Sequence, residues 1–230
     1  EGARSGLDVP ADSLMPQMPF TGTSQTWMGP MDMGVDFRDM STLDYSNTAP
    51  SRPSFMVKRG FGALVSKVGQ SLPVSMNTPV TRIRWGGKGV TVDTPTGTLR
   101  TKACIITVST GVLAAGNIVF DPPLPSWKLD AINDVPMGLL AKIALKFQGT
   151  RFDLTDNAWL TYLVEETMPA EACFFLCWPF GEDLMIGFVG GSFGYELSRA
   201  GASTAIDFGL EELRKLFGGE VDKHFVKGHF

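Results

Sequence analysis

Residues 79–108 read PVTRIRWGGKGVTVDTPTGTLRTKACIITV, and this stretch decides the fold class. Apolar and polar residues alternate along Pro79–Trp85, as they do in a strand with one buried face. The turns Gly86–Gly89 and Pro95–Gly97 then divide the stretch into three strands. The last strand, Thr98–Val108, ends in a run that is apolar on both faces, which is typical of a central strand. We therefore expect a three-stranded meander whose third strand enters the core of a sheet.

The segment before the meander predicts a strand–helix–strand unit, with its elements at Phe55–Lys58, Ala63–Val68 and Pro73–Met76. Gly60 and Gly62 lie in its first turn, where a phosphate-binding loop between strand and helix belongs. The third glycine position of such a loop holds Val65, and Val80 stands where its ribose-binding acid belongs. The pattern therefore favours an ordinary tight turn over a dinucleotide fingerprint.

A second unit follows the proline-rich hinge Asp121–Pro125. Its first elements are predicted to be a helix with Ser126 as N-cap, a strand and a hairpin, at residues 126–133, 139–147, 172–179 and 184–190. Ser203 or Thr204 then caps a helix with one apolar face, made of Ile206, Leu210, Leu213 and Phe217. A last strand is expected at Val221–Phe230. Together the two units indicate an α+β or α/β protein.

Residues 1–54 are rich in proline and methionine and show no clear period, so we expect loops and short helices there. One helix start lies at Asp39–Asp44, capped by Ser41 or Thr42. The aromatic and methionine side chains of residues 15–61 allow two interpretations. They line an apolar pocket for an amine or another small substrate, or they serve in ordinary core packing, which is the commoner use.

The composition excludes several classes of protein. The chain has 230 residues, of which 43% are hydrophobic and 19% charged, so it is globular and not disordered. Its 20 basic and 24 acidic residues give a net charge of −4, which offers no basic footprint for nucleic acid. The sequence holds no apolar run of about 18 residues and no signal peptide, so we expect a cytoplasmic protein without a membrane partner.

The three cysteines and two histidines predict neither a metal site nor a disulfide scaffold. Cys173 and Cys177 lie in one apolar run, and their spacing to His224 and His229 matches no common zinc pattern. We expect both thiols to be buried and inert.

Lys142 is the candidate catalytic residue on the predicted strand at 139–147. The period of two places it on the face opposite Ile143, together with Lys146. Two solvated lysines on an outer face are the simpler interpretation of this pattern. The functional interpretation is a lysine that projects into a cavity and orients a water or an anion.

The ordered motifs of this chain resemble those of the flavin-dependent amine oxidases, the monoamine and polyamine oxidase family, and bacterial flavin monoamine oxidases most of all. The resemblance covers most of residues 55–230. It rests on Val57–Leu64, Leu72–Val74, Asn77–Ile83, Gly89–Val92, Gly97, Ala103–Leu113, Ile118–Pro125 and Met137–Phe147. It implies the middle part of a two-domain fold. Residues 55–122 would be a partial FAD-binding domain. Residues 1–54 and 123–230 would form a substrate domain with helices and a mixed or antiparallel sheet.

The resemblance also implies a chemistry. The intact enzyme would pass a hydride equivalent from the carbon that bears a primary or secondary amine to FAD, and oxygen would reoxidise the flavin. In the family, the residue that matches Val80 contacts the adenine through its backbone, and the residue that matches Lys142 holds a water against the flavin. Ser109, after the expected central strand, is a further cofactor-side candidate.

The family's N-terminal Gly-x-Gly-x-x-Gly motif and its C-terminal flavin-covering segment are absent from the sequence, and Arg59 stands where the family often has glycine. We therefore expect a central fragment that carries no FAD and oxidises no amine by itself. We also expect it to self-associate or exchange segments with a second copy, because Ile105, Ile106 and Val108 would lie on an unpaired sheet edge.

Two other functions stay open at this point. One is a non-catalytic interaction or scaffold chain that keeps the oxidase middle without its chemistry. The other is a different flavin oxidoreductase of the same architecture, such as a carotenoid desaturase.

Overall fold

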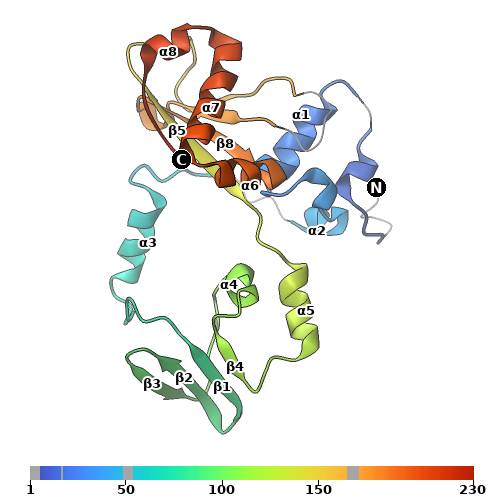
Figure 1. The fold of residues 1–230 in the computed structure, drawn as a ribbon, viewed down its shortest axis with the longest axis vertical. Helices are drawn as coiled ribbons and strands as arrows, with labels where there is room; N and C mark the ends of the chain where they lie inside the picture. Colours follow the sequence, from blue (N-terminus) through green and yellow to red (C-terminus); the bar gives the residue numbers. More distant parts are fainter. Residues whose placement is uncertain (1–5, 17, 49–53, 165–170) are drawn as a thin grey trace. The chain divides into compact units, whose positions relative to one another are not determined.

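The computed structural model describes residues 6–16, 18–48, 54–164 and 171–230, and these form two compact units. Unit 1 combines the chain up to Ser54 with Gly138–Phe230, and unit 2 is Phe55–Met137 (Figure 1). The sequence places the second boundary at residues 122/123, whereas in the structure it follows Met137. The difference arises because helix α5 (Ser126–Asp134) packs against helix α4 (Thr110–Ala114), which lies in unit 2.

The meander in unit 2 is confirmed. Strands β1 (Arg82–Gly87), β2 (Gly89–Thr94) and β3 (Gly97–Thr101) pair antiparallel in sequence order. Strand β4 (Val119–Asp121) adds to the free edge of β1 in parallel, so this four-stranded sheet is mixed. The buried side chains of Ile83 and Val92 lie on its inner face, as the alternation predicts.

The predicted extension of the third strand is wrong, because Ala103–Val108 is not a strand in the structure. Ile105 is 88% exposed, and within the described ranges no strand lies beside this segment. An apolar run indicates a preference for burial. A strand also needs a neighbouring strand with which its backbone groups form hydrogen bonds.

The two short strands expected around the first helix are also not formed. Helix α3 (Phe61–Gly69) is present with Gly60 as its N-cap, but residues 54–57 and 73–75 carry no strand pairing. Gly60 and Gly62 therefore lack the preceding strand that a phosphate-binding turn requires.

Unit 1 is built on a five-stranded sheet with the order β6-β7-β8-β5-β9. The strands are β5 (Leu140–Phe147), β6 (Ala158–Leu160), β7 (Phe174–Cys177), β8 (Leu184–Gly190) and β9 (Phe225–His229). The predicted hairpin is confirmed as β7–β8. Every described pair in this sheet is antiparallel, so the mixed sheet lies in unit 2 and not here.

Helices cover one face of this sheet and complete the main core. They are α6 (Gly191–Ala200), α7 (Ala202–Phe217) and α8 (Glu220–His224). Ile143, Leu145 and Phe147 of β5 are fully buried beneath them, and Leu213 of α7 packs into the same cluster. The predicted buried and exposed faces of β5 and the apolar face of α7 are therefore correct.

The predicted helix starts need correction. Pro125 and Gly201 occupy the N-cap positions of α5 and α7, so neither Ser126 nor Ser203 or Thr204 is a cap. The expected last strand begins only at Phe225. Residues 220–224 form α8, and the pairing with β5 starts at Phe225.

The N-terminal segment of unit 1 consists of short helical turns, as expected. They are η2 (Ala11–Leu14), α1 (Thr21–Thr26), the π-helical η3 (Trp27–Met31), η4 (Phe37–Asp39) and α2 (Thr42–Asn47). The predicted cap is confirmed, since the Ser41 hydroxyl accepts a hydrogen bond from the backbone N–H of Asp44 at 2.9 Å. The buried Asp36 carboxylate accepts a 3.0 Å hydrogen bond from the N–H of Ser192, which ties this segment to the first turn of α6.

Candidate functional site: an aromatic sheet face that ends at a lysine

Lys142 lies on the face of the sheet opposite the helix-covered core. In register it stands directly across from Phe188 of β8, and its ammonium lies 5.6 Å from the centre of that ring. The ammonium also donates a 3.1 Å hydrogen bond to the carbonyl of Leu140. A cation above an aromatic face is attracted by the ring quadrupole, so Phe188 and Leu140 together hold the lysine head close to the sheet.

Aromatic rings continue from Phe188 across the same face. Phe188 contacts Trp159 of β6 at 5.1 Å between ring centres, and Trp159 contacts Trp27 of η3 at 5.1 Å. Trp27 also lies 5.1 Å from Phe174 of β7. Phe174 shares a row with Phe188 and Lys142, because residues directly opposite in a ladder point to one side. We call Trp27, Trp159, Phe174, Phe188 and Lys142 the aromatic face.

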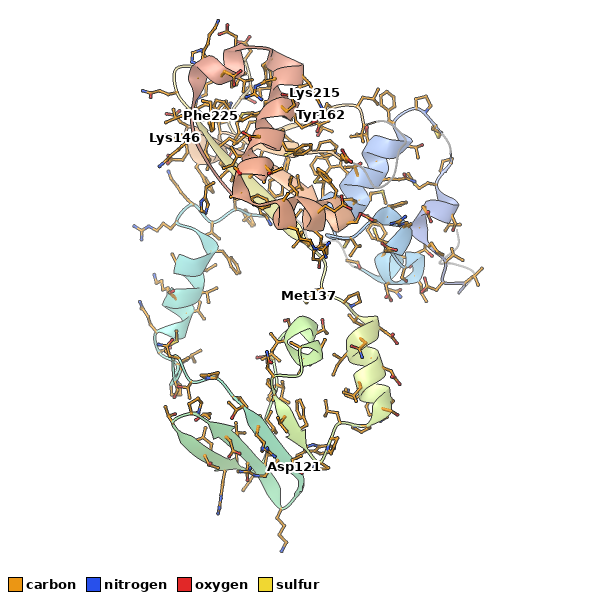
Figure 2. The ribbon with its side chains drawn as sticks, viewed as in Figure 1. Asp121, Met137, Lys146, Tyr162, Lys215 and Phe225 are labelled. Atoms are coloured by element: carbon orange, nitrogen blue, oxygen red, sulfur yellow. The ribbon has the colours of Figure 1, made fainter. Side chains whose placement is uncertain are left out.

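A partly buried hydrogen-bonded cluster supports the aromatic face beside β7. The hydroxyl oxygen of Tyr162 accepts a 2.8 Å hydrogen bond from the N–H of Cys173, next to Phe174, and the Tyr162 ring packs against Phe174 at 5.5 Å. Burial, with the adjacent Glu212 carboxylate, raises the pKa of Tyr162 well above its usual value, so the phenol stays neutral. Lys215 pairs with Glu212 and balances its charge. Lys215 and Tyr162 are labelled in Figure 2.

The sequence alone predicts only part of this face. Lys142 was a candidate, and Trp27 falls within the methionine- and aromatic-rich segment whose use was left open. Trp159, Phe174 and Phe188 were missed. The alternation in β7 and β8 is present in the sequence, but it does not say which face of the sheet the helices α6, α7 and α8 cover.

The two predicted cofactor-side residues lie in unit 2. Val80 is half-buried just before β1, and among the described residues its backbone amide and carbonyl make no hydrogen bond. The adenine contact that the resemblance implies for Val80 stays a prediction. Ser109 is exposed and caps α4, because its hydroxyl accepts a 3.4 Å hydrogen bond from the N–H of Val112. Its role as a cofactor contact stays a prediction.

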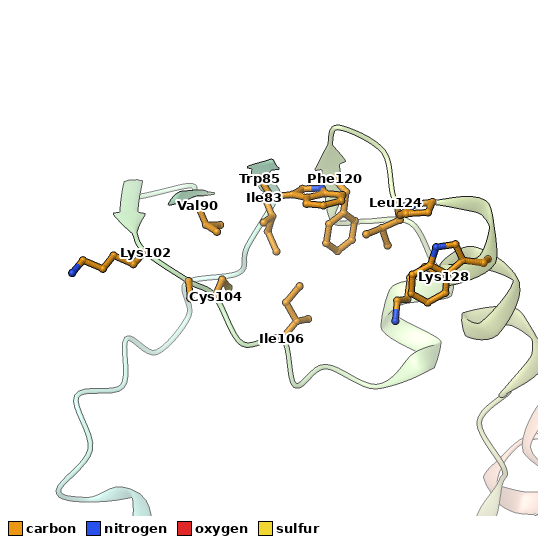
Figure 3. A pocket seen from close by; sticks show the side chains of 12 residues that line it. Ile83, Trp85, Val90, Lys102, Cys104, Ile106, Phe120, Leu124 and Lys128 are labelled. Atoms are coloured by element: carbon orange, nitrogen blue, oxygen red, sulfur yellow. The ribbon is translucent and has the colours of Figure 1, made fainter. Parts of the chain in front are cut away.

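Unit 2 also contains an apolar hollow of about 500 Å³ (Figure 3). The side chains of Ile83, Phe120 and Ile106 point into it from β1, β4 and the extended segment after β3. Trp85 and Trp127 line it further, and Lys102 and Lys128 lie at its rim. Most of the side chains that line the hollow are apolar, and its lining also includes the free thiol of Cys104.

Two absences hold for the part of the chain that the structure describes. No three or more His, Cys, Asp or Glu side chains gather as they would around a metal ion. No helix there combines the length and apolar character needed to cross a bilayer. Cys173 and Cys177 are both buried, as expected.

Comparison with known proteins places this chain in a family. The model of a family described as flavin containing amine oxidoreductase matches residues 35–229. The chain belongs to this family. The resemblance drawn from its motifs is thereby confirmed, and the fold is part of the FAD-dependent amine oxidase fold.

Curated relatives of this chain include two rice (Oryza sativa subsp. japonica) proteins. Polyamine oxidase 4 is 33% identical over 163 residues, which cover 70% of this chain and 33% of the relative. Polyamine oxidase 5 is 30% identical over 191 residues, which cover 82% of this chain and 38% of the relative. The chain thus spans about a third of the length of these relatives.

Another rice relative is named lysine-specific histone demethylase 1 homolog 1, and it is 30% identical over 80% of this chain and 24% of its own length. Among solved structures, cyclohexylamine oxidase from Brevibacterium oxydans IH-35A matches with a TM-score of 0.59 and 22% identity. That match covers 86% of this chain and 46% of the other. At this identity the likeness shows the fold alone.

Proposed function

We propose that the whole protein to which this chain belongs oxidises primary or secondary amines with FAD, and that the aromatic face of unit 1 is the wall against which the amine binds. The observation that carries the proposal is the continuous row of rings from Trp27 to Phe188, which ends at Lys142. Family membership supports the flavin chemistry.

The aromatic face supplies three things to such a reaction. Its exposed rings offer an apolar surface for the carbon skeleton of a substrate, and they exclude water from it. Their negative faces attract a cationic amine on its approach. The Lys142 ammonium at the end of the row offers donors that hold a water or an anion at a fixed point, because β5 is paired with β8 and β9 on its two sides.

FAD would contribute the acceptor for the hydride equivalent that leaves the amine-bearing carbon. Of the residues in this chain, Val80 would hold its adenine through the free backbone groups, and Ser109 is the further candidate. Lys142 is proposed as the catalytic residue on the substrate side.

The experiment compares Lys142→Met with Lys146→Met in the whole flavoprotein. Both lysines are exposed on the same face of β5, but Lys146 stands opposite Leu184 and Lys227, away from the rings. We expect Lys142→Met to slow flavin reduction or reoxidation by about a hundredfold, the scale of a lost proton-handling contact. Lys146→Met should stay within about twofold of the unaltered enzyme, and rapid-mixing absorbance of the flavin measures both.

Small and equal effects of the two substitutions would show that both lysines are only a solvated face. The alternative function, a non-catalytic scaffold chain, predicts a different observation. In that case the whole protein would be purified without flavin absorbance.

A further inference from the structure

The two units carry charge of opposite sign. Residues 55–137 hold nine basic and four acidic side chains, a net charge of +5, although the whole chain carries −4. Five of these basic residues lie within β1–β3 and the residue after them, at positions 82, 84, 88, 100 and 102, against the single carboxylate Asp93. The meander is therefore a local basic surface on an acidic chain, and it has no part in the function proposed above.

Strand pairing gathers three of these cations around one hollow. Arg84 stands opposite Thr91, and Thr91 stands opposite Arg100, so the two arginines share one row on the same face. They are two strands apart, about 10 Å between backbones, a distance that two arginine side chains span from both ends. Lys88 is the single residue between β1 and β2 at the tip of the hairpin.

The hollow has a volume of about 280 Å³, just below the range of pockets for drug-sized ligands. Besides the three cations it is lined by Trp85, Thr91, Thr101 and the glycines of the hairpin, and none of its described lining residues is acidic. We call it the basic groove. The register of β1 against β2 shifts between Arg84 and Gly87, and this bulge parts the strands beside the groove.

Arg84 is held in position, whereas the other two cations are available. Its guanidinium contacts both carboxylate oxygens of Asp93, at 2.6 and 2.7 Å, and the Thr98 hydroxyl donates to the same carboxylate at 2.9 Å. Within the described ranges, neither Lys88 nor Arg100 has a carboxylate at ion-pair distance. A fixed guanidinium flanked by two free cations is the donor set that phosphate oxygens require.

We propose that the basic groove binds a phosphate group, either as inorganic phosphate or as a phosphomonoester. Lys88 and Arg100 supply the charge that pairs with the dianion, and Arg84 orients it.

The test is calorimetric titration of the 230-residue chain with inorganic phosphate at constant ionic strength. We expect saturable binding in the millimolar range. Lys88→Ser combined with Arg100→Ser should weaken it at least about tenfold, because two charge-assisted contacts are lost. The control is Lys58→Ser combined with Lys67→Ser, which removes two exposed lysines of the same unit and should change the affinity less than about twofold. Arg84 is left intact, because its loss would leave the Asp93 carboxylate without its ion-pair partner.

Circular dichroism of each variant before titration checks that its fold is kept. AMP distinguishes the two sources of phosphate: tighter binding than inorganic phosphate indicates a phosphomonoester, and equal binding indicates the bare ion. Equal weakening in both double variants, or no saturation with phosphate, would overturn the proposal. A glutamate-rich peptide that displaces phosphate at lower concentration would overturn it too, in favour of a surface for acidic protein segments.

Discussion

At the scale of single residues, the buried thiol of Cys177 makes stability depend on alkaline pH. Its side chain is fully buried in the unit 1 core, and burial raises the pKa of the Cys177 thiol from 9.0 to about 11. A folded-state pKa above the unfolded value means that the stabilisation is complete below pH 9 and is lost as the pH rises from 9 towards 11.

We therefore predict that the free energy of unfolding of unit 1 falls over this range by an amount on the order of 2 kcal/mol from Cys177 alone. Cys177→Ala should show a shallower pH dependence, although Cys173 and Tyr162 are titrated in the same direction. Urea titrations followed by tryptophan fluorescence measure it. Cys104→Ala, at an exposed thiol, is the matched control and should keep the original slope. Parallel profiles for Cys177→Ala and the unaltered chain would contradict the prediction.

At the scale of elements, the packing of η3 against β8 depends on one glycine. A Cβ at Gly190 would lie 1.9 Å from the carbonyl oxygen of Pro30, which is backbone and cannot turn aside. η3 carries Trp27, so this close approach also places the first ring of the aromatic face.

We predict that Gly190→Ala lowers the stability of unit 1 by about 1–3 kcal/mol, the usual range for overpacking, and alters the fluorescence of Trp27. Denaturant titration gives the first quantity and emission spectra the second. Gly219→Ala serves as the control, because its φ is −68° and a Cβ there would meet nothing within 4 Å. It should change stability by no more than about 0.5 kcal/mol. Similar losses in both variants would mean that the contact with Pro30 is readily relieved.

At the scale of the whole molecule, the exposed segment after β3 predicts self-association of this chain. Ile105 is 88% exposed, and Ile106 and Val108 are 41% and 40% exposed on the same extended segment. Apolar side chains next to unpaired backbone groups form a template for a second copy.

We predict that the apparent mass of the chain in light scattering rises with concentration in the micromolar range, and that Ile105→Lys reduces this rise strongly. Leu72→Lys, at a leucine of the same unit that is 57% exposed, should reduce it little. A monomer at every concentration would show that the segment is satisfied within one copy and that the expected self-association is wrong.

Local pattern determined much of this protein. The alternation in β1 and β5, the turns between β1, β2 and β3, the β7–β8 hairpin and the apolar face of α7 were all predictable. Each of these features depends on a hydrophobic period or a turn motif in consecutive residues. The side chains that predict the element therefore belong to that element itself.

Only the tertiary structure decided where partners meet. Residues 103–108 have the composition of a central strand, yet no described strand pairs with them. The apolar composition of a segment does not determine which strand it pairs with. Trp27 reaches Trp159 only through the close approach of η3 to β8, and Arg84 faces Arg100 only through the register of three strands. Contacts between residues far apart in the chain depend on register and on backbone approach, and neither of these is written in the local period.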